Sequence, residues 1–373
     1  MAQPDAQESR FRSLIFSPGL THAASVRLVV GMIGRLLFAA FLVLLPLPAS
    51  ATGITEEDFT MAAAYSRSHG GLALRVQQGG RMIFEDYATG WSASTPHRIF
   101  SGTKSFVAVG ALIAEQQGLL DLDEPASKTL PEWSHDRRRT ITLNELLSQT
   151  SGLDPGGDII YPARDQFAAA LRVSLISTPG TRFHYGPVGF QAFGEILKRK
   201  LEPSDQSVEG WLRRQVFRPM DIHIAYWKHD DAGNPLLHAG LWLTAAEWAK
   251  FGDYVLEELT GSKKLVVDHK LFKSLFTGHE ANPAYGLGWW LNAPLPSPRL
   301  EKMSDYQPAI DGDQIYPDGP RVYAALGSDK QRLYIIPSLD LVIVRFGYES
   351  RFSDGDFLSR LITGRPHPDA HTH

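Results

Sequence analysis

The sequence of 373 residues contains no cysteine. This absence excludes disulfide bonds, zinc–thiolate centres and a cysteine nucleophile. Positive charge is also thinly spread, because no run of Lys and Arg is longer than three residues, as in Arg137–Arg139, and the formal net charge is −4. Binding to nucleic acid needs a basic face, so we expect no nucleic-acid partner. We also expect no cofactor and no metal ion.

Long apolar runs are scarce too, and the longest lies near the N-terminus. Leu36–Leu47 follows the basic residue Arg35 and precedes Ala49–Ala51, which has the A-x-A pattern of a cleavage site. The run is shorter than the ~20 residues that cross a bilayer. We interpret residues 1–51 as an export signal segment, with Met32 as a candidate true start, and expect a periplasmic or secreted protein with no stable membrane span after cleavage. A retained membrane anchor is the alternative.

The strongest chemical signal is Ser101, followed three residues later by Lys104. Apolar residues recur at helical spacing over Val107–Gln117, so both side chains should lie on one face of the first turn of a helix. A serine hydroxyl attacks poorly unless a neighbouring base takes its proton. Lysine can act as that base only when neutral, which desolvation and a helix N-terminus favour. One S-x-x-K is nevertheless expected by chance in about every chain of this length.

Three further segments make the signal more specific, namely Gly118–Pro125, Thr142–Leu153 and Pro179–Tyr185. In this order, the motifs resemble those of the serine β-lactamase and penicillin-binding protein group. The resemblance is to the branch that holds class C β-lactamases, D,D-peptidases, family VIII esterases and 6-aminohexanoate-dimer hydrolases. It covers about residues 55–365.

The resemblance implies an α+β fold of the β-lactamase/D,D-peptidase type, in which helices flank an antiparallel sheet and an all-helical lobe is inserted. We therefore predict one domain over residues 52–365, followed by a disordered tail at 366–373. Its α/β lobe would comprise residues 52–100 and 285–365, and its helical lobe residues 101–284. Sequence patterns predict helices at 56–68, 167–176, 187–201, 208–216, 245–259 and 356–363, and strands at 71–78, 82–87, 286–291, 322–326, 332–336 and 341–346.

The resemblance also implies roles for individual residues. Ser101 is the acylated nucleophile, Lys104 its base, and Tyr185 the group that moves the proton to the leaving group. We expect the neighbouring lysine to favour the ionised form of Tyr185, which would let it act as a base. The amide N–H groups of Ser101 and Ser328 are the candidates for the oxyanion hole, and Gly327 would allow the strand to approach the substrate closely.

Two positions depart from the family pattern. Pro187 stands where the family has an asparagine, and Ala325–Gly327 stands where the family has K-T-G or H-x-G. The site therefore lacks the cation that anchors a substrate carboxylate, unless Lys330 or Arg332 replaces it. This absence favours neutral esters or amides.

We interpret the chain as an exported serine hydrolase that acts on a small ester or amide. The runner-up is a β-lactamase or D,D-peptidase, and a further alternative is a catalytically silent binding homologue. Of Trp289 and Trp290, strand alternation should send one inward and the other toward the cleft or the opposite face, and we favour the core for them. His184 should be structural, whereas His238 could line the cleft. The sequence leaves the oligomeric state open.

Overall fold

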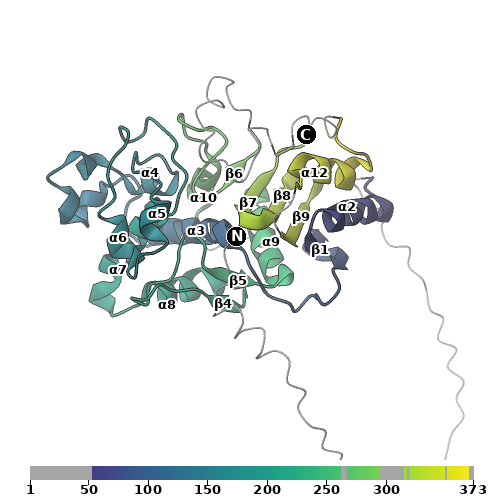
Figure 1. Ribbon diagram of the computed structural model, residues 1–373, viewed down its shortest axis with the longest axis horizontal. Coiled ribbons are helices and arrows are strands. Elements are labelled where there is room, and N and C mark those ends of the chain that lie inside the picture. The colour runs from purple at the N-terminus through teal and green to yellow at the C-terminus, as the bar shows by residue number, and fades with distance from the viewer. Residues whose placement is uncertain (1–52, 262–266, 294–314, 317–318, 349–350, 369–373) are drawn as a thin grey trace, which may run out of the picture. The chain divides into compact units, whose positions relative to one another are not determined.

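The computed structural model describes residues 53–261, 267–293, 315–316, 319–348 and 351–368 (Figure 1). The predicted signal segment and its cleavage site therefore lie outside the described residues. Within the described ranges, no helix combines the length and the apolar character that crossing a bilayer requires.

A six-stranded antiparallel sheet joins the two ends of the chain. Its order is β2-β1-β9-β8-β7-β6, so the first strands of the chain pair with the last one. The strands are β1 (Gly71–Gln78), β2 (Arg81–Tyr87), β6 (Trp290–Leu291), β7 (Tyr323–Gly327), β8 (Gln331–Ile336) and β9 (Leu341–Gly347). The class predicted from the sequence, α+β with an antiparallel sheet flanked by helices, is confirmed.

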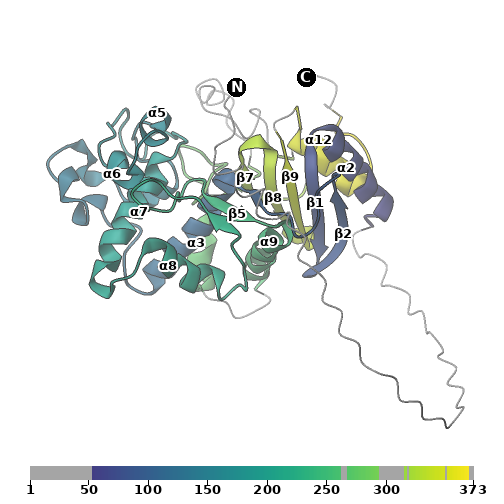
Figure 2. The same cartoon turned by 60° about the horizontal axis from the view of Figure 1, so that its bottom comes forward.

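Both faces of this sheet are covered by helices, as Figure 2 shows. On β8, Leu333 and Ile335 belong to the core cluster shared with α9 (Ala245–Thr260). Tyr334 and Ile336 point to the opposite face, since side chains alternate along a strand. That second face is covered by the two terminal helices, α2 (Glu56–Ser68) and α12 (Asp354–Thr363). Strands β8 and β9 are consequently buried along their whole length.

The remaining helices lie between β2 and β6 in the sequence. Helix α3 (Thr103–Gln116) runs through the middle of this part, and every residue from Thr103 to Ala114 is buried. From Phe106 to Ala114 this helix is apolar on every side, and such a helix needs a buried environment. The others are α4 (Leu143–Leu147), α5 (Gly157–Ile160), α6 (Gln166–Ala170), α7 (Val188–Leu201), α8 (Val208–Leu212) and α10 (His269–Phe272). A small sheet of order β3-β5-β4 joins His97–Arg98, Leu241–Leu243 and Tyr226–Trp227.

Two of the predicted elements agree fully with the structure. Helix 56–68 and strand 71–78 match α2 and β1 residue for residue. The predicted helix 167–176 is wrong beyond Ala170, because Leu175 instead forms a bridge with Leu153. The predicted strand 286–291 is reduced to β6, since Gly288 has a φ of +70° and turns the chain there. The three-stranded sheet was not predicted.

The domain and lobe boundaries stay predictions. Of the predicted tail, residues 369–373 lie outside the described ranges. The amide of His367 donates to Asp356 Oδ1 at 2.9 Å, which ties the preceding segment to α12.

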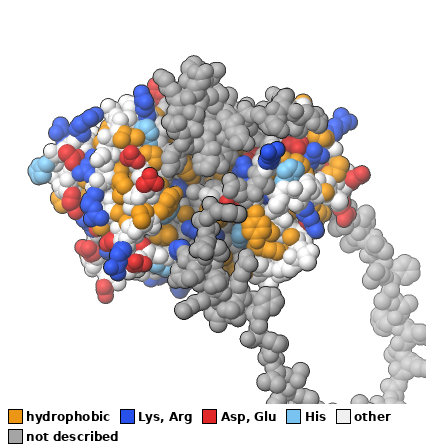
Figure 3. All heavy atoms as spheres, viewed as in Figure 1, with side chains coloured by type: hydrophobic (Ala, Val, Ile, Leu, Met, Phe, Trp, Pro, Cys, Tyr) orange, Lys and Arg blue, Asp and Glu red, His pale blue; other side chains and the backbone are white. Residues whose placement is uncertain are grey.

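The described surface adds little to the stability of the fold. On the face shown in Figure 3, Lys and Arg side chains are interspersed with Asp and Glu. Exposed pairs contribute little to stability, and Arg164 and Asp231 form one at 3.3 Å. Because the chain has no cysteine, stability must come from the two buried clusters on either face of the sheet.

Candidate active site

The structure brings Ser101 and Lys104 together at the start of α3. Ser101 lies in a 3₁₀ turn, Phe100–Gly102, that leads directly into the helix, and Lys104 occupies the first helical turn. Lys104 Nζ lies 3.0 Å from Ser101 Oγ and donates a second hydrogen bond to the backbone carbonyl of His238 at 2.9 Å. The predicted nucleophile and its predicted base are thus in direct contact.

The environment of Lys104 favours its neutral form. Burial in the centre of the molecule lowers its pKa to about 7. Its ammonium lies 4.8 Å from the ring centroid of Tyr185 and 5.7 Å from that of Phe190, and no carboxylate pairs with it among the described residues. Aromatic rings compensate a buried charge only in part. A substantial fraction of Lys104 is therefore neutral near pH 7, as a general base requires.

The backbone next to Ser101 is strained and crowded. Phe100 has a φ of +46°, a conformation that a bulky residue adopts only where the surrounding structure imposes it. Strand β7 approaches this turn so closely that a Cβ atom on Gly327 would lie 2.2 Å from the carbonyl oxygen of Ile99. Position 327 must therefore be glycine. Neither the N–H of Ser101 nor that of Ser328 has a partner within the described part of the chain.

Tyr185 lies beside Ser101 and Lys104, but its protonation state differs from the expected one. Burial raises its pKa to about 12, although a side-chain hydrogen bond with Ser101 acts in the opposite direction. The expectation that the ionised form of Tyr185 is favoured is therefore wrong, because desolvation by burial is the largest effect on its pKa. Neutral Tyr185 is a proton donor beside Ser101.

An aromatic cluster surrounds Tyr185. Its ring centroid lies 5.5 Å from that of Trp290 and 5.9 Å from that of Tyr285, and Trp290 also hydrogen-bonds with its hydroxyl. Phe183 packs against the same rings. Trp289, by contrast, is fully buried in the main core. The alternation expected for the two tryptophans is thus present, and Trp290 supports Tyr185.

Sequence reasoning missed one residue that holds this segment in place. The side chain of Gln149 donates to the carbonyl of Gly186 at 3.2 Å and accepts from its N–H at 3.1 Å. Its own carbonyl accepts the N–H of His184 at 2.8 Å, so Gln149 clamps the backbone on both sides of Tyr185. Gln149 is buried and has a φ of +62°. A polar residue inside the Thr142–Leu153 motif was the available signal.

The two histidines occupy different surroundings. His184 pairs through Nε2 with Ser177 Oγ at 2.9 Å, and burial lowers its pKa. This interaction agrees with a structural role. The ring of His238 is buried 5.7 Å from the ring of Tyr161, which is 63% exposed. The contact that His238 makes with Lys104 is through its backbone carbonyl, a contact that no sequence pattern indicates.

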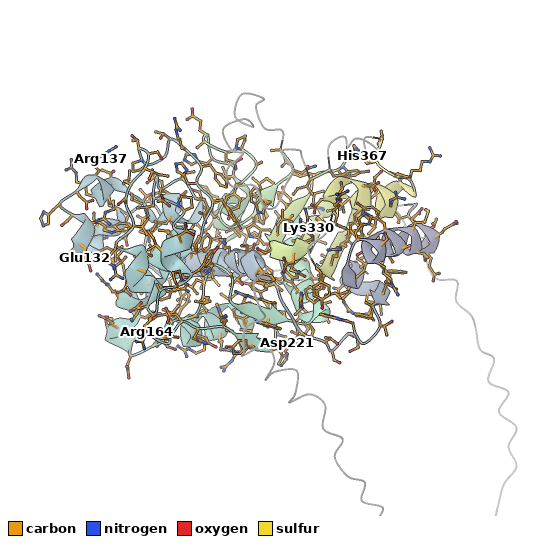
Figure 4. All side chains as sticks on the ribbon, in the orientation of Figure 1. Glu132, Arg137, Arg164, Asp221, Lys330 and His367 are labelled. Atoms are coloured by element: carbon orange, nitrogen blue, oxygen red, sulfur yellow. The ribbon has the colours of Figure 1, made fainter. Side chains whose placement is uncertain are left out.

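The departures from the family pattern have clear places in the structure. Pro187 is the N-terminal cap residue of α7 and makes no side-chain capping bond. Ala325 on β7 is buried and carries no charge toward a substrate. Arg332 does not replace the missing cation, because its buried guanidinium binds Asp354 Oδ1 at 2.6 Å. Lys330 is half-buried at the turn after β7 (Figure 4).

Comparison with known proteins agrees with this fold. The family model described as beta-lactamase matches residues 56–347, and the chain belongs to that family. Members of the family are serine hydrolases. Protein flp of Staphylococcus aureus strain MW2 is 27% identical over 236 residues, which cover 54% of this chain and 47% of the relative. The chain thus spans about half the length of the curated relatives that it matches.

Solved structures with the same fold include proteins named for diverse activities. A D-stereospecific amidohydrolase from Streptomyces sp. aligns with a TM-score of 0.61 and 16% identity, covering 85% of this chain and 99% of that one. A class C β-lactamase from Rhodobacter sphaeroides aligns with a TM-score of 0.59 and 18% identity, covering 82% and 99%. At such identities the likeness establishes the fold, and the chemistry has to be argued from the site.

Proposed function

We propose that the chain is a serine hydrolase that cleaves ester or amide bonds through an acyl-enzyme on Ser101. The observation that carries the proposal is the 3.0 Å contact between Ser101 Oγ and Lys104 Nζ, together with a lysine pKa of about 7. A structural lysine at a buried helix start would gain most from a carboxylate partner. This lysine faces a hydroxyl instead.

The groups support a complete acyl-transfer cycle. Ser101 Oγ attacks the substrate carbonyl while its proton passes to neutral Lys104, and the N–H groups of Ser101 and Ser328 bind the oxyanion. Tyr185, neutral and hydrogen-bonded with Ser101, donates a proton to the departing oxygen or nitrogen. Protonated Lys104 then gives its proton to the phenolate of Tyr185, which restores both groups. Water attacks the acyl-enzyme while Lys104 takes its proton, and that proton passes to Ser101 Oγ as the acid leaves.

The substrate that fits this site best is a neutral ester or amide. A substrate carboxylate would need a cation on β7, and that strand offers Ala325 and Leu326, both buried. Arg332 is already committed to Asp354. A β-lactam or D,D-peptide substrate would therefore bind without its usual anchor.

The decisive experiment is covalent labelling with a fluorophosphonate. The native protein should be labelled on Ser101, whereas Ser101→Ala should lose both the label and the hydrolysis of p-nitrophenyl butyrate. The matched control is Ser177→Ala, which removes a half-buried serine whose Oγ pairs with the imidazole of His184. This control should keep both properties. Labelling of Ser177 in the native protein, or turnover that survives in Ser101→Ala, would refute the assignment, and an unlabelled native protein would identify a silent binding homologue.

Export is a separate proposal, supported by the leader-like pattern of Leu36–Leu47 followed by Ala49–Ala51. In cells that make the protein naturally, the N-terminus of the mature chain should be Thr52. Peptides from the first thirty or so residues, if abundant in mass spectra of that protein, would contradict the proposed start at Met32.

A further inference from the structure

Behind the proposed oxyanion hole lies a buried ion pair with no role in the steps above. Arg332 on β8 is fully buried, and its guanidinium donates twice to the carboxylate of Asp354, from Nε at 2.6 Å and from Nη2 at 3.1 Å. Asp354 opens α12 and also accepts a hydrogen bond from the hydroxyl of Tyr334. Although its burial acts to raise the pKa of Asp354, the charge of Arg332 holds it below the usual value, so both partners are charged.

The same guanidinium also reaches the end of β7. Arg332 Nη1 donates to the carbonyl oxygen of Gly327 at 3.0 Å. This carbonyl and the N–H of Ser328 belong to one peptide group, and the structure contains no cis peptide among its described residues. In a planar trans peptide, the C=O and N–H bonds point in opposite directions. A contact that fixes the carbonyl of Gly327 therefore fixes the direction of the Ser328 N–H.

The other side of this peptide group is also constrained. The contact between Gly327 and the carbonyl of Ile99 presses the end of β7 against the turn that carries Ser101. Ser328 is exposed, and its N–H has no partner among the described residues. Only the carbonyl side of the peptide is thus occupied by a charged donor. Such a bond polarises the amide, which makes its N–H a stronger donor.

We propose that Arg332, held by Asp354, is a positioning residue for catalysis that aims and polarises the peptide between Gly327 and Ser328. The proposal rests on the proposed function, since it assigns a purpose to one donor of the oxyanion hole. A buried ion pair adds little net stability, because removing its charges from water costs about as much as their attraction returns. Here the pair orients a group that must not move during the reaction.

The test uses the mature protein with four variants. Arg332→Lys retains the charge, but a lysine ammonium cannot bind Asp354 and Gly327 at the same time as the planar guanidinium does. The double variant Arg332→Gln/Asp354→Asn removes both charges together. Asp354→Asn alone loosens the guanidinium. The matched control is Arg345→Gln, because Arg345 is a second buried arginine, paired in register with Arg332, that donates to the carbonyl of Lys330 and not to that of Gly327. Circular dichroism establishes which variants fold.

Two readouts separate positioning from a general structural role. We expect kcat for p-nitrophenyl butyrate to fall about 10- to 100-fold in the Arg332 variants, with KM nearly unchanged, because an oxyanion donor acts mainly in the transition state. The affinity for an arylboronic acid, which forms a tetrahedral adduct with Ser101, should fall by a similar factor. Arg345→Gln should change each value less than about threefold.

The outcomes distinguish this proposal from the function on which it rests. Equal losses in the Arg332 and Arg345 variants, or a loss confined to KM, would overturn the positioning role. If the double variant Arg332→Gln/Asp354→Asn does not fold, the losses in Arg332→Lys and Asp354→Asn are compared with the loss in Arg345→Gln instead. Turnover that survives in Ser101→Ala would overturn the proposed function instead, whatever the Arg332 variants do.

Discussion

Lys104 and Tyr185 meet face on, with the lysine Nζ lying 4.8 Å from the centre of the tyrosine ring. The same burial acts on both groups and separates their pKa values in opposite directions, to about 7 for Lys104 and about 12 for Tyr185. Desolvation penalises the charged form of each, and that form is the protonated lysine but the deprotonated tyrosine. Lys104 is consequently suited to accept a proton and Tyr185 to give one.

The first prediction concerns the pH dependence of acylation. Because only neutral Lys104 can take the proton of Ser101, kcat/KM should rise with pH and reach half its maximum at about pH 7. Lys104→Arg should lose activity at every pH, since a guanidinium stays protonated. Rate measurements between about pH 5 and 9 give the profile. An activity that is flat across this range would show that Lys104 is not the base.

The second prediction separates the hydroxyl of Tyr185 from the packing of its ring. Tyr185→Phe removes the proton donor and should reduce kcat at least ~100-fold while the fold is retained. Tyr285→Phe is the matched control, because Tyr285 is also buried and packs edge-on against Tyr185. This control should retain activity within a few-fold. Equal activity of the two variants would make Tyr185 a packing residue.

The third prediction concerns substrate class. Losing a charge-assisted hydrogen bond to a substrate carboxylate costs roughly 1.5 to 3 kcal/mol, which is about one to two orders of magnitude in rate. We expect kcat/KM for p-nitrophenyl acetate or butyrate to exceed clearly that for nitrocefin or penicillin G. Lys330→Ala should leave the ratio unchanged. Efficient nitrocefin hydrolysis that collapses in Lys330→Ala would show that Lys330 supplies the missing cation.

The fourth prediction concerns stability away from the site. Burial, with the nearby charge of Glu257, raises the pKa of Asp253 on α9 to about 7, although Asp253 accepts a hydrogen bond from Gln77. Its Oδ1 atom is buried without a partner among the described residues. A raised carboxyl pKa gives stability that is fully present below about pH 4 and is lost as the pH rises through about 7.

Asp253→Asn removes this penalty and keeps the shape of the side chain. The variant should therefore unfold at a higher urea concentration than the native protein at about pH 8.5, and the difference should shrink toward about pH 5. Asp231→Asn, at a largely exposed position, is the control and should show little difference at either pH. A difference that does not vary with pH would rule out the titration of Asp253 as its cause.

The sequence could predict features that depend on residues close together in the chain, but not features that depend on contacts between distant segments. The helical spacing after Ser101 and the apolar runs of β8 and β9 are local, so they predicted these three elements and the pairing of Ser101 with Lys104. The protonation of Tyr185 is set by burial among residues far away in the sequence. No local sequence pattern indicates this burial, so the predicted protonation state of Tyr185 was wrong.

The contacts of Arg332 and Gln149 were out of reach for the same reason. Arg332 looked like a spare cation because its partner, Asp354, lies on another element. Gln149 acts through the backbone of Gly186, and a motif does not reveal which backbone groups meet. In both cases the sequence did not show which group the side chain contacts.

The place of β9 in the sheet has a consequence for how the protein is made. β9 pairs with β1 on one side and with β8 on the other. Within the described sheet, it therefore joins β1 and β2 to β6, β7 and β8. The chain must therefore leave the ribosome at least as far as β9 before the sheet can form, and until then the hairpin of β1 and β2 presents an open edge that invites aggregation. A nascent chain interrupted before Leu341 would therefore contain two half-sheets that no strand connects.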